Sequence, residues 1–188
     1  MSETSLEFQS IHDRFRPRVL RYLKRLVGDG EAEDLAQSVM LKVSEGLSDF
    51  RGDSRLSTWI YRIATNAALD SLRHKAIQPL NETDLESDER SVALEAQVPS
   101  GEAAAIRKEM NECVREFIER VPQNYKTVLV LSELEGFKNS EIAAILGISV
   151  DTVKIRLHRA REKLRTSLQT GCTFYRNADS ELACDRKA

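Results

Sequence analysis

A basic segment near the end of the chain carries the side chains whose spacing most clearly predicts a chemical function. Residues 150 to 165, VDTVKIRLHRAREKLR, hold six Lys or Arg against two acids, although the formal net charge of the whole chain is only -2. Apolar residues recur at helical spacing, at Val153, Leu157, Ala160 and Leu164, and predict the face that packs inward. Cationic groups on the opposite face could bind phosphates and base edges, so this helix is a candidate for the DNA major groove.

The residues before this helix complete a helix-turn-helix pattern. Ser140 is placed to cap a short helix, Gly147 can adopt the positive φ of a tight turn, and Ser149 can cap the basic helix. The core that the two helices share is expected to contain Ile142, Leu146, Ile148 and Val153. A charged helix face is more often only solvated, but the two caps, the turn and the basic outer positions together favour DNA binding.

The elements that must position this helix are predicted to be helical as well. Apolar residues follow helical spacing over about 8–26, 31–45 and 56–74, and no stretch alternates long enough to predict a sheet. Between residues 81 and 102 there are seven acids and one base, with too few apolar side chains to offset the entropy cost of ordering. We therefore predict an all-α chain, in which two small helical domains are joined by a flexible acidic linker and followed by a short Cys-containing tail.

Composition argues against several classes of protein. No apolar run approaches the roughly 18 to 20 residues needed to cross a bilayer, and the start of the chain, MSETSLEFQS, lacks the pattern of a signal peptide. We therefore expect a cytoplasmic protein with no membrane insertion. The chain has no Gly-rich phosphate loop, no HExxH motif and no nucleophile beside its base, so we expect neither an enzyme nor a cofactor.

Two parts of the chain resemble a known family. The stretches GDGEAEDLAQSVMLKV and FRGDSRLSTWIYRIATNAALDSLRHK resemble region 2 of bacterial sigma-70 family sigma factors of the extracytoplasmic-function (ECF) group. The stretch VPQNYKTVLVLSELEGFKNSEIAAILGISVDTVKIRLHRAREKLR resembles region 4 of the same family. We place region 2 at residues 7–75, the acidic linker at 76–105, region 4 at 106–168 and a tail of unassigned role at 169–188.

The resemblance implies a dissociable subunit for transcription initiation that has no catalytic residues of its own. Such a protein binds core RNA polymerase at the clamp helices of the largest subunit and at the flap. It opens the minus-10 promoter element with region 2, reads the minus-35 element with region 4, and is commonly controlled by an anti-sigma factor. Residues 76–102 would reach roughly 90 Å at ~3.3 Å per residue, which suffices to separate two domains that read the same promoter.

The same resemblance assigns roles to individual residues. Contacts with core polymerase are expected at Asp34 and Gln37. Contacts with the minus-10 element are expected at Arg51, Asp53, Ser54, Arg55, Trp59, Arg62, Asn66 and Arg73. Contacts with the minus-35 element are expected at Thr152, Lys154, Ile155, Arg156, His158, Arg159 and Arg161. For Trp59, which could stack on a base or anchor the loop in the core, we favour the core.

The tail and its cysteines leave several interpretations open. Cys172 and Cys184 could form a redox disulfide, join His158 at a metal or bind an anti-sigma partner, but free thiols are the interpretation we favour. Cys113 lies at an apolar helical position and is expected in the core.

Other classes of protein remain as alternatives to a sigma factor. A helix-turn-helix repressor or activator would account for residues 139–165 but would leave the region 2 stretches without a role, and it would bind its operator alone. An anti-sigma or adaptor protein would bind polymerase components without supporting transcription. Run-off transcription with purified core polymerase distinguishes these classes.

Overall fold

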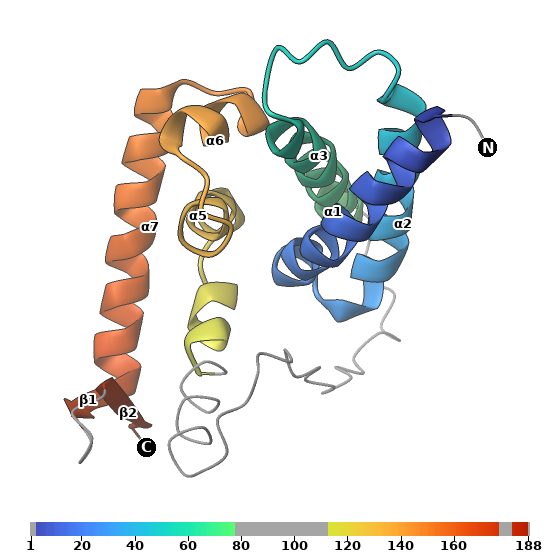
Figure 1. Ribbon diagram of the computed structural model, residues 1–188. Helices are drawn as coiled ribbons and strands as arrows, with labels where there is room; N and C mark the ends of the chain where they lie inside the picture. Colours follow the sequence, from blue (N-terminus) through green and yellow to red (C-terminus); the bar gives the residue numbers. More distant parts are fainter. Residues whose placement is uncertain (1–2, 78–112, 177–181, 188) are drawn as a thin grey trace.

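The computed structural model describes residues 3–77, 113–176 and 182–187, which form two helical bodies packed side by side (Figure 1). The expected linker at 76–105 lies outside the described residues, apart from its first two positions, which continue a helix. A search of the described helices for a stretch long and apolar enough to cross a membrane finds none.

The N-terminal body is a bundle of three helices. They are α1 (Glu3–Val27), α2 (Asp29–Gly46) and α3 (Leu56–Ile77). Side chains from all three meet in an apolar core, where Val19, Tyr22, Val39 and Ile60 have no exposed surface. The bundle holds the exposed faces of α2 and α3 in fixed positions, because burying these side chains supplies most of the stabilisation of such a small domain.

The C-terminal body contains the predicted helix-turn-helix. After the helical residues 113–119 it contains α5 (Gln123–Leu129), the π-helical turn η1 (Val130–Leu134), α6 (Asn139–Leu146) and α7 (Val150–Gly171). The long helix α7 packs along α5 and α6 (Figure 1). The core between them includes Val128, Leu131, Ile142 and Val153, all without exposed surface.

A small β-hairpin follows α7 and lies at its foot (Figure 1). Strand β1 (Cys172–Arg176) pairs antiparallel with β2 (Leu182–Arg186), with Cys172 opposite Arg186 and Phe174 opposite Cys184. The predicted fold of two helical domains followed by a short tail is therefore confirmed, and the hairpin is a feature of that tail which the sequence did not predict. The strands have five residues each. Cys172 is the one buried residue of β1, and Ala183 is buried in β2, so neither strand shows the alternation of apolar and polar residues that would predict it.

The two bodies are joined by a continuous apolar contact. Buried residues of both belong to one cluster, and α3 packs against α6. At this contact the ring of Tyr61 on α3 meets the ring of Phe137 edge to face, with 4.7 Å between the ring centroids. Such aromatic pairs contribute about 0.5–1.5 kcal/mol beyond the area they bury. We call this contact the seam.

Candidate nucleic-acid interface

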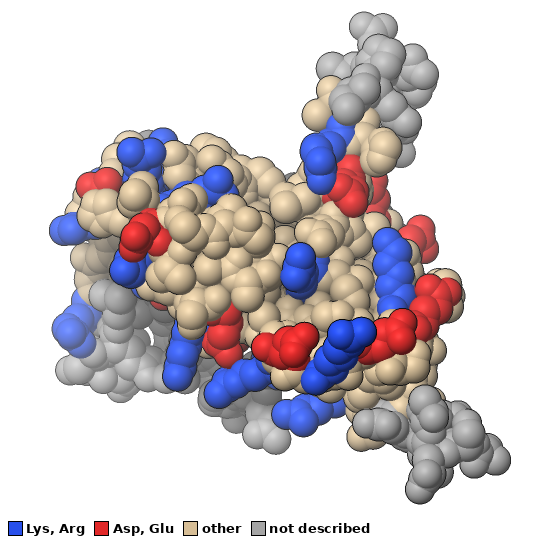
Figure 2. Space-filling view, turned by 90° about the horizontal axis from the view of Figure 1, so that it is seen from above, with Lys and Arg blue, Asp and Glu red and all other residues tan. Residues whose placement is uncertain are grey.

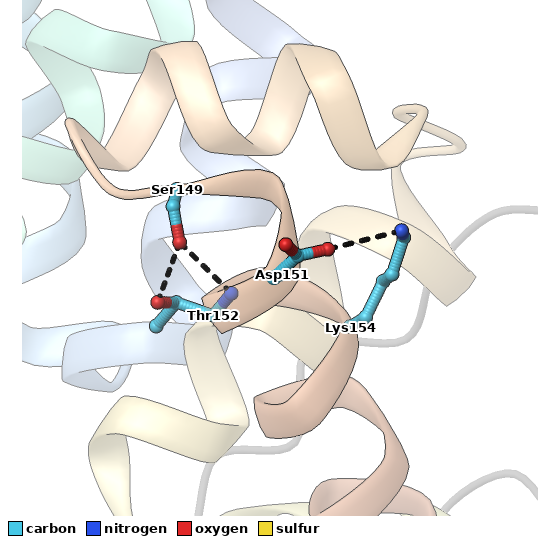
Figure 3. Close-up of polar contacts among 4 residues, drawn as sticks. All are labelled: Ser149, Asp151, Thr152 and Lys154. Carbon is cyan, nitrogen blue, oxygen red and sulfur yellow. Dashed lines mark hydrogen bonds and ion pairs between the residues drawn. The ribbon is translucent and has the colours of Figure 1, made fainter.

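The turn between α6 and α7 has the geometry that the sequence predicts. Gly147 ends α6 in the left-handed region at φ 64°, where a side chain would be strained, and Ile148 N donates to Ala143 O at 3.1 Å. Ser149 caps α7, because its Oγ accepts from Thr152 N at 3.1 Å and lies 2.8 Å from Thr152 Oγ1 (Figure 3). These bonds fix the direction in which α7 leaves the turn.

The start of α6 differs from the prediction. Ser140 lies inside the helix and is exposed, so it is not the cap. The residue before α6 is Lys138, whose backbone N donates to the Glu141 carboxylate at 2.9 Å. A carboxylate in the first turn accepts a hydrogen bond from a free N–H and interacts favourably with the helix dipole. Glu141 therefore provides the cap that was expected of Ser140.

The outer face of α7 presents the predicted minus-35 residues in two groups. The exposed ones are Lys154, Ile155, His158, Arg159 and Arg161, whereas Thr152 and Arg156 are half-buried. Lys154 Nζ lies 3.1 Å from Asp151 Oδ1, within the first turn and a half of the helix (Figure 3). Exposed pairs of this kind are weak, at about 0.2–1 kcal/mol, so a phosphate can replace Asp151 as the partner of the lysine.

Besides Lys154, two more of these side chains have acidic partners. Arg161 donates twice to Glu133 Oε1, at 2.6 and 3.1 Å, and so ties α7 to η1. His158 Nε2 lies 3.7 Å from Glu162 Oε2 on the same helix. Both arrangements are at the surface and leave the remaining donors of Arg161 available for a backbone phosphate.

The predicted minus-10 residues lie in the loop between α2 and α3 and along one side of α3. Arg51, Asp53 and Arg55 are exposed and Ser54 is half-buried. On α3 the remaining candidates recur at intervals of three, four and seven residues, which places them along one side of the helix: Trp59, Arg62, Asn66 and Arg73.

Trp59 anchors this loop. Its ring lies 5.2 Å from the ring of Phe50, measured between centroids, and packs over Gly46, where an added Cβ would come within 3.0 Å of the indole. The side chain is only partly buried, and it packs against the apolar core. This geometry supports the anchoring role that the sequence analysis favoured for Trp59.

Asp34 and Gln37, the predicted polymerase contacts, are both exposed on α2. Leu41, which was not among the residues predicted from the sequence, is 60% exposed on the same helix, one turn beyond Gln37. Asp34, Ser38 and Leu41 are spaced by four and three residues and therefore share a face. A single exposed leucine is ordinary on a protein surface, so its link to the predicted contact is the helix face that it shares with Asp34, a spacing that is visible in the sequence.

The seam contains a buried ionic network that the sequence did not predict. Glu135, which is 7% exposed at the side chain, accepts from Arg25 Nη1 at 2.8 Å and from the Tyr61 hydroxyl at 2.5 Å. Burial, with the neighbouring Glu135 carboxylate, raises the pKa of Tyr61 far above its ordinary value, so the phenol remains a donor.

A second ion pair crosses between the two bodies at the surface. Nη1 of Arg55, a predicted minus-10 residue, lies 3.2 Å from Oε1 of Glu141 on α6. One region 4 side chain, Glu141, is therefore paired with a candidate DNA contact of region 2.

Charge on the upper face of the molecule is mixed. Figure 2 shows Lys and Arg interspersed with Asp and Glu over both bodies, with broad uncharged areas between them. The Lys and Arg side chains do not merge into one continuous positive patch on this face. This distribution agrees with the nearly balanced charge of the whole chain.

The three cysteines lie at the other end of α7. Cys172 is buried and Cys113 Sγ lies 3.6 Å from its Sγ, although Cys113 is only half-buried and not in the core as expected. His158 is fourteen residues before Cys172, about 21 Å along the helix, so the alternative that places it with the cysteines at a metal is wrong. No group of three or more His, Cys, Asp or Glu among the described residues has the geometry to hold a metal ion.

Comparison with known proteins gives the same two parts. A family model for sigma-70 region 2 matches residues 11–77, and a model for sigma-70 region 4 matches residues 111–164. The RNA polymerase sigma-H factor of Pseudomonas aeruginosa is 35% identical over 161 residues, covering 83% of each chain. The ECF RNA polymerase sigma factor SigW of Bacillus subtilis is 32% identical over 166 residues, covering 86% of this chain and 89% of the relative.

Two solved structures share the fold. The sigma factor RpoE in complex with the anti-sigma factor NepR from Bartonella quintana has a TM-score of 0.68 at 22% identity, covering 87% of this chain and 97% of that one. CnrH in complex with the cytosolic domain of CnrY has a TM-score of 0.61 at 23% identity, covering 87% and 88%.

Proposed function

The chain belongs to the ECF group of the sigma-70 family, and from this premise we propose which of its residues carry each step of promoter recognition. As an ECF sigma factor it is a non-catalytic subunit for transcription initiation, which binds core RNA polymerase and promoter DNA. The observation that carries the residue assignments is the capped helix-turn-helix, which presents basic side chains beside a separate bundle with its own exposed basic side chains.

The N-terminal half of α7 reads the minus-35 element. Lys154, Arg156 and Arg159 supply the cations for base edges and phosphates, and Ile155, which is 53% exposed and has no donor, contacts a thymine methyl group. Thr152 and Arg161 contact the backbone, and His158 lies on the same face. The Ser149 cap supports this assignment, because directional base contacts need a helix whose axis is fixed.

The loop before α3 and one side of α3 bind the minus-10 element. Unpaired bases must be held outside the stack at a cost of a few kcal/mol per step, and phosphate contacts offset part of that cost. Arg51, Arg55, Arg62 and Arg73 supply these contacts, and Asn66 supplies a polar one. Asp53, Ser54 and Trp59 shape the loop that receives the strand.

The exposed face of α2 docks on core polymerase. Leu41 supplies apolar area, and Asp34 and Gln37 supply polar contacts that set orientation. Helix α2 lies on the side of the N-terminal body away from region 4 (Figure 1), and the seam is made by α3 and α6, so docking on α2 is compatible with the packed regions.

The seam keeps the free protein closed. The two promoter elements are read at separate places on the duplex, whereas α3 and α6 pack directly against each other here. Binding to core polymerase therefore separates the regions and releases Arg55 from Glu141. Because RpoE and CnrH are each seen with a protein partner, we extend the proposal to control by an anti-sigma factor, acting in the cytoplasm.

Run-off transcription with purified core polymerase tests the residue assignments. The wild-type chain should support a promoter-specific transcript and produce permanganate-reactive thymines at the minus-10 element only when core polymerase is present. Paired substitutions should separate the two surfaces, because Arg62→Ala should reduce permanganate reactivity and Leu41→Ala should reduce binding to core polymerase. Loss of core binding in Arg62→Ala, or unchanged core binding in Leu41→Ala, would overturn the corresponding assignment.

A further inference from the structure

The C-terminal end of α7, opposite the end with the candidate DNA contacts, is held against residues 113–119. Phe117 is buried against Gly171, where an added Cβ would lie 2.4 Å from the ring. Arg186 on β2 pairs with Glu116, and Lys187 N donates to Gly171 O at 2.9 Å. Residues 113–119, the last turn of α7 and the hairpin therefore form one packed unit at the foot of region 4.

Three thiols meet inside this unit. The Sγ atoms of Cys113 and Cys172 are 3.6 Å apart, although the residues are separated by 59 positions in the sequence. The thiol of Cys184, opposite Phe174 in the hairpin, interacts with both of the other two. Cys172 is buried, whereas Cys113 and Cys184 are half-buried and therefore accessible to a small oxidant.

From this placement we propose that Cys113 and Cys172 are a reversible oxidation site, at which a peroxide converts the two thiols to an intramolecular disulfide. The Cys113 thiolate attacks one peroxide oxygen, which forms the sulfenic acid and releases the other oxygen as an alcohol or water. The Cys172 thiol then displaces the sulfenic oxygen as water and forms the S–S bond. The two sulfurs lose two electrons in total, and the peroxide gains them.

The surroundings of the thiols bear on the rate of this reaction. Burial raises the pKa of Cys113, and its thiol neighbour Cys172 raises it further, whereas Arg186 lowers it. Burial also raises the pKa of Cys184, which has Asp185 beside it, and Glu116 is the acid that faces the cluster from residues 113–119. Because little thiolate is present at neutral pH, oxidation should be slow and should respond to sustained exposure.

The position of the site predicts what the disulfide changes. It would join residues 113–119 to the C-terminal end of α7 and close a loop between residues that are far apart in the chain, which disfavours the unfolded state. The DNA-facing end of α7 is 22 residues away, about 33 Å along the helix. We therefore expect oxidation to stabilise region 4 and to leave promoter binding by the holoenzyme within about two-fold of its reduced value.

Peptide mapping of the full-length protein tests the proposal. The fully reduced chain is treated with hydrogen peroxide, the remaining thiols are alkylated, and the protein is digested without reductant and analysed by mass spectrometry. A peptide pair joined through Cys113 and Cys172, absent after dithiothreitol, is the expected product. Cys113→Ser and Cys172→Ser should lose it, and the matched variant Cys184→Ser should keep it.

Thermal unfolding gives a second measurement on the same samples, with circular dichroism to show that each variant is folded. Oxidation should raise the melting temperature of the wild type and of Cys184→Ser by roughly 5–10 °C and leave Cys113→Ser unchanged. The proposal fails if a folded chain forms no internal disulfide, if the bond joins Cys184 instead, or if one tightly bound Zn²⁺ protects all three thiols from alkylation.

Discussion

Region 4 presents its candidate DNA contacts from one capped helix, whereas region 2 presents half of its candidates from a loop. On α7 the Ser149 cap and the apolar side chains Val153 and Leu157 fix both the direction and the rotation of the helix. The loop around Arg51 is held mainly by the packing of Trp59 on Phe50 and Gly46. The difference matches the two targets, because reading a duplex needs fixed donors and trapping an unpaired strand does not.

The two regions also differ in how their cations are paired. Arg161 of region 4 is paired within its own region, to Glu133, whereas Arg55 of region 2 is paired across the seam, to Glu141. Opening the seam would therefore free a cation of region 2 and leave α7 unchanged. Of these two cations, Arg55 in region 2 is therefore the candidate DNA contact whose pairing depends on the closed state.

The largest expected effect comes from breaking the rigid support of α7. Ile142→Ala removes a side chain with no exposed surface from the core between α6 and α7, and should lower the free energy of unfolding of region 4 by about 2–5 kcal/mol. Thermal unfolding measures this loss. The surface variant Ile155→Ala should change stability by less than about 0.5 kcal/mol. Equal effects of the two would mean that α7 does not depend on this core.

Removing one cation from the DNA-facing side of α7 should have the next largest effect. Arg159→Ala should weaken binding of holoenzyme to promoter DNA by about 10- to 100-fold, equivalent to roughly 1–3 kcal/mol for a lost base-edge contact. Arg165→Ala is the matched control, since Arg165 is also exposed on α7 and its loss changes the net charge equally. Footprinting at several salt concentrations distinguishes the loss of a base contact from the loss of one positive charge. Similar losses of promoter affinity in both variants would mean that Arg159 contributes only its charge and makes no specific base contact.

Breaking the seam should have a moderate effect on stability and a visible effect on shape. Glu135→Gln removes the charge that faces Arg25 and weakens the bond from Tyr61, at a cost of about 1–3 kcal/mol for a buried network. Small-angle X-ray scattering should show a larger radius of gyration for the free variant. The control Glu133→Gln affects contacts with Arg161 and Ser132, both inside region 4, and this variant should stay compact. A compact Glu135→Gln protein would contradict a closed state held by this network.

The smallest effect is expected within region 2, where Glu31 joins α2 to α3. Desolvation opposes ionisation of Glu31, but the hydrogen bonds from Lys75 and Ser71 outweigh it and hold its pKa below the ordinary value. The folded pKa is thus lower than the unfolded one, so the contribution is present above about pH 4.3 and is lost as the pH falls through the folded pKa.

Glu31→Gln should therefore cost less than about 1 kcal/mol at pH 7, because the pair is partly exposed. Denaturant unfolding at pH 7 and at pH 3 measures the difference, which should shrink at the lower pH. Glu45→Gln, an exposed position on the same helix, should show no such dependence. A difference that grows at acid pH would have the wrong sign for this explanation.

Sequence reasoning predicted the helices and the turn because their signals are local. The caps and apolar spacing around Gly147 and Ser149 specify a helix-turn-helix from residues within a few positions of one another. The same reasoning missed the cap made by Glu141 and the hairpin. In the first case a carboxylate replaced the expected serine, and in the second the strands are too short and too exposed to show a period.

By itself, therefore, the sequence determined the family, the two helical regions and the candidate DNA-facing side chains, since each depends on spacing along one segment. Only the tertiary structure decided that Glu135 lies between Arg25 and Tyr61, and that Cys113 meets Cys172. Those neighbours are far apart in the chain, and no local pattern encodes which surfaces of two packed bodies meet. Their proximity follows from how the helices pack to bury apolar area, which depends on all the elements together.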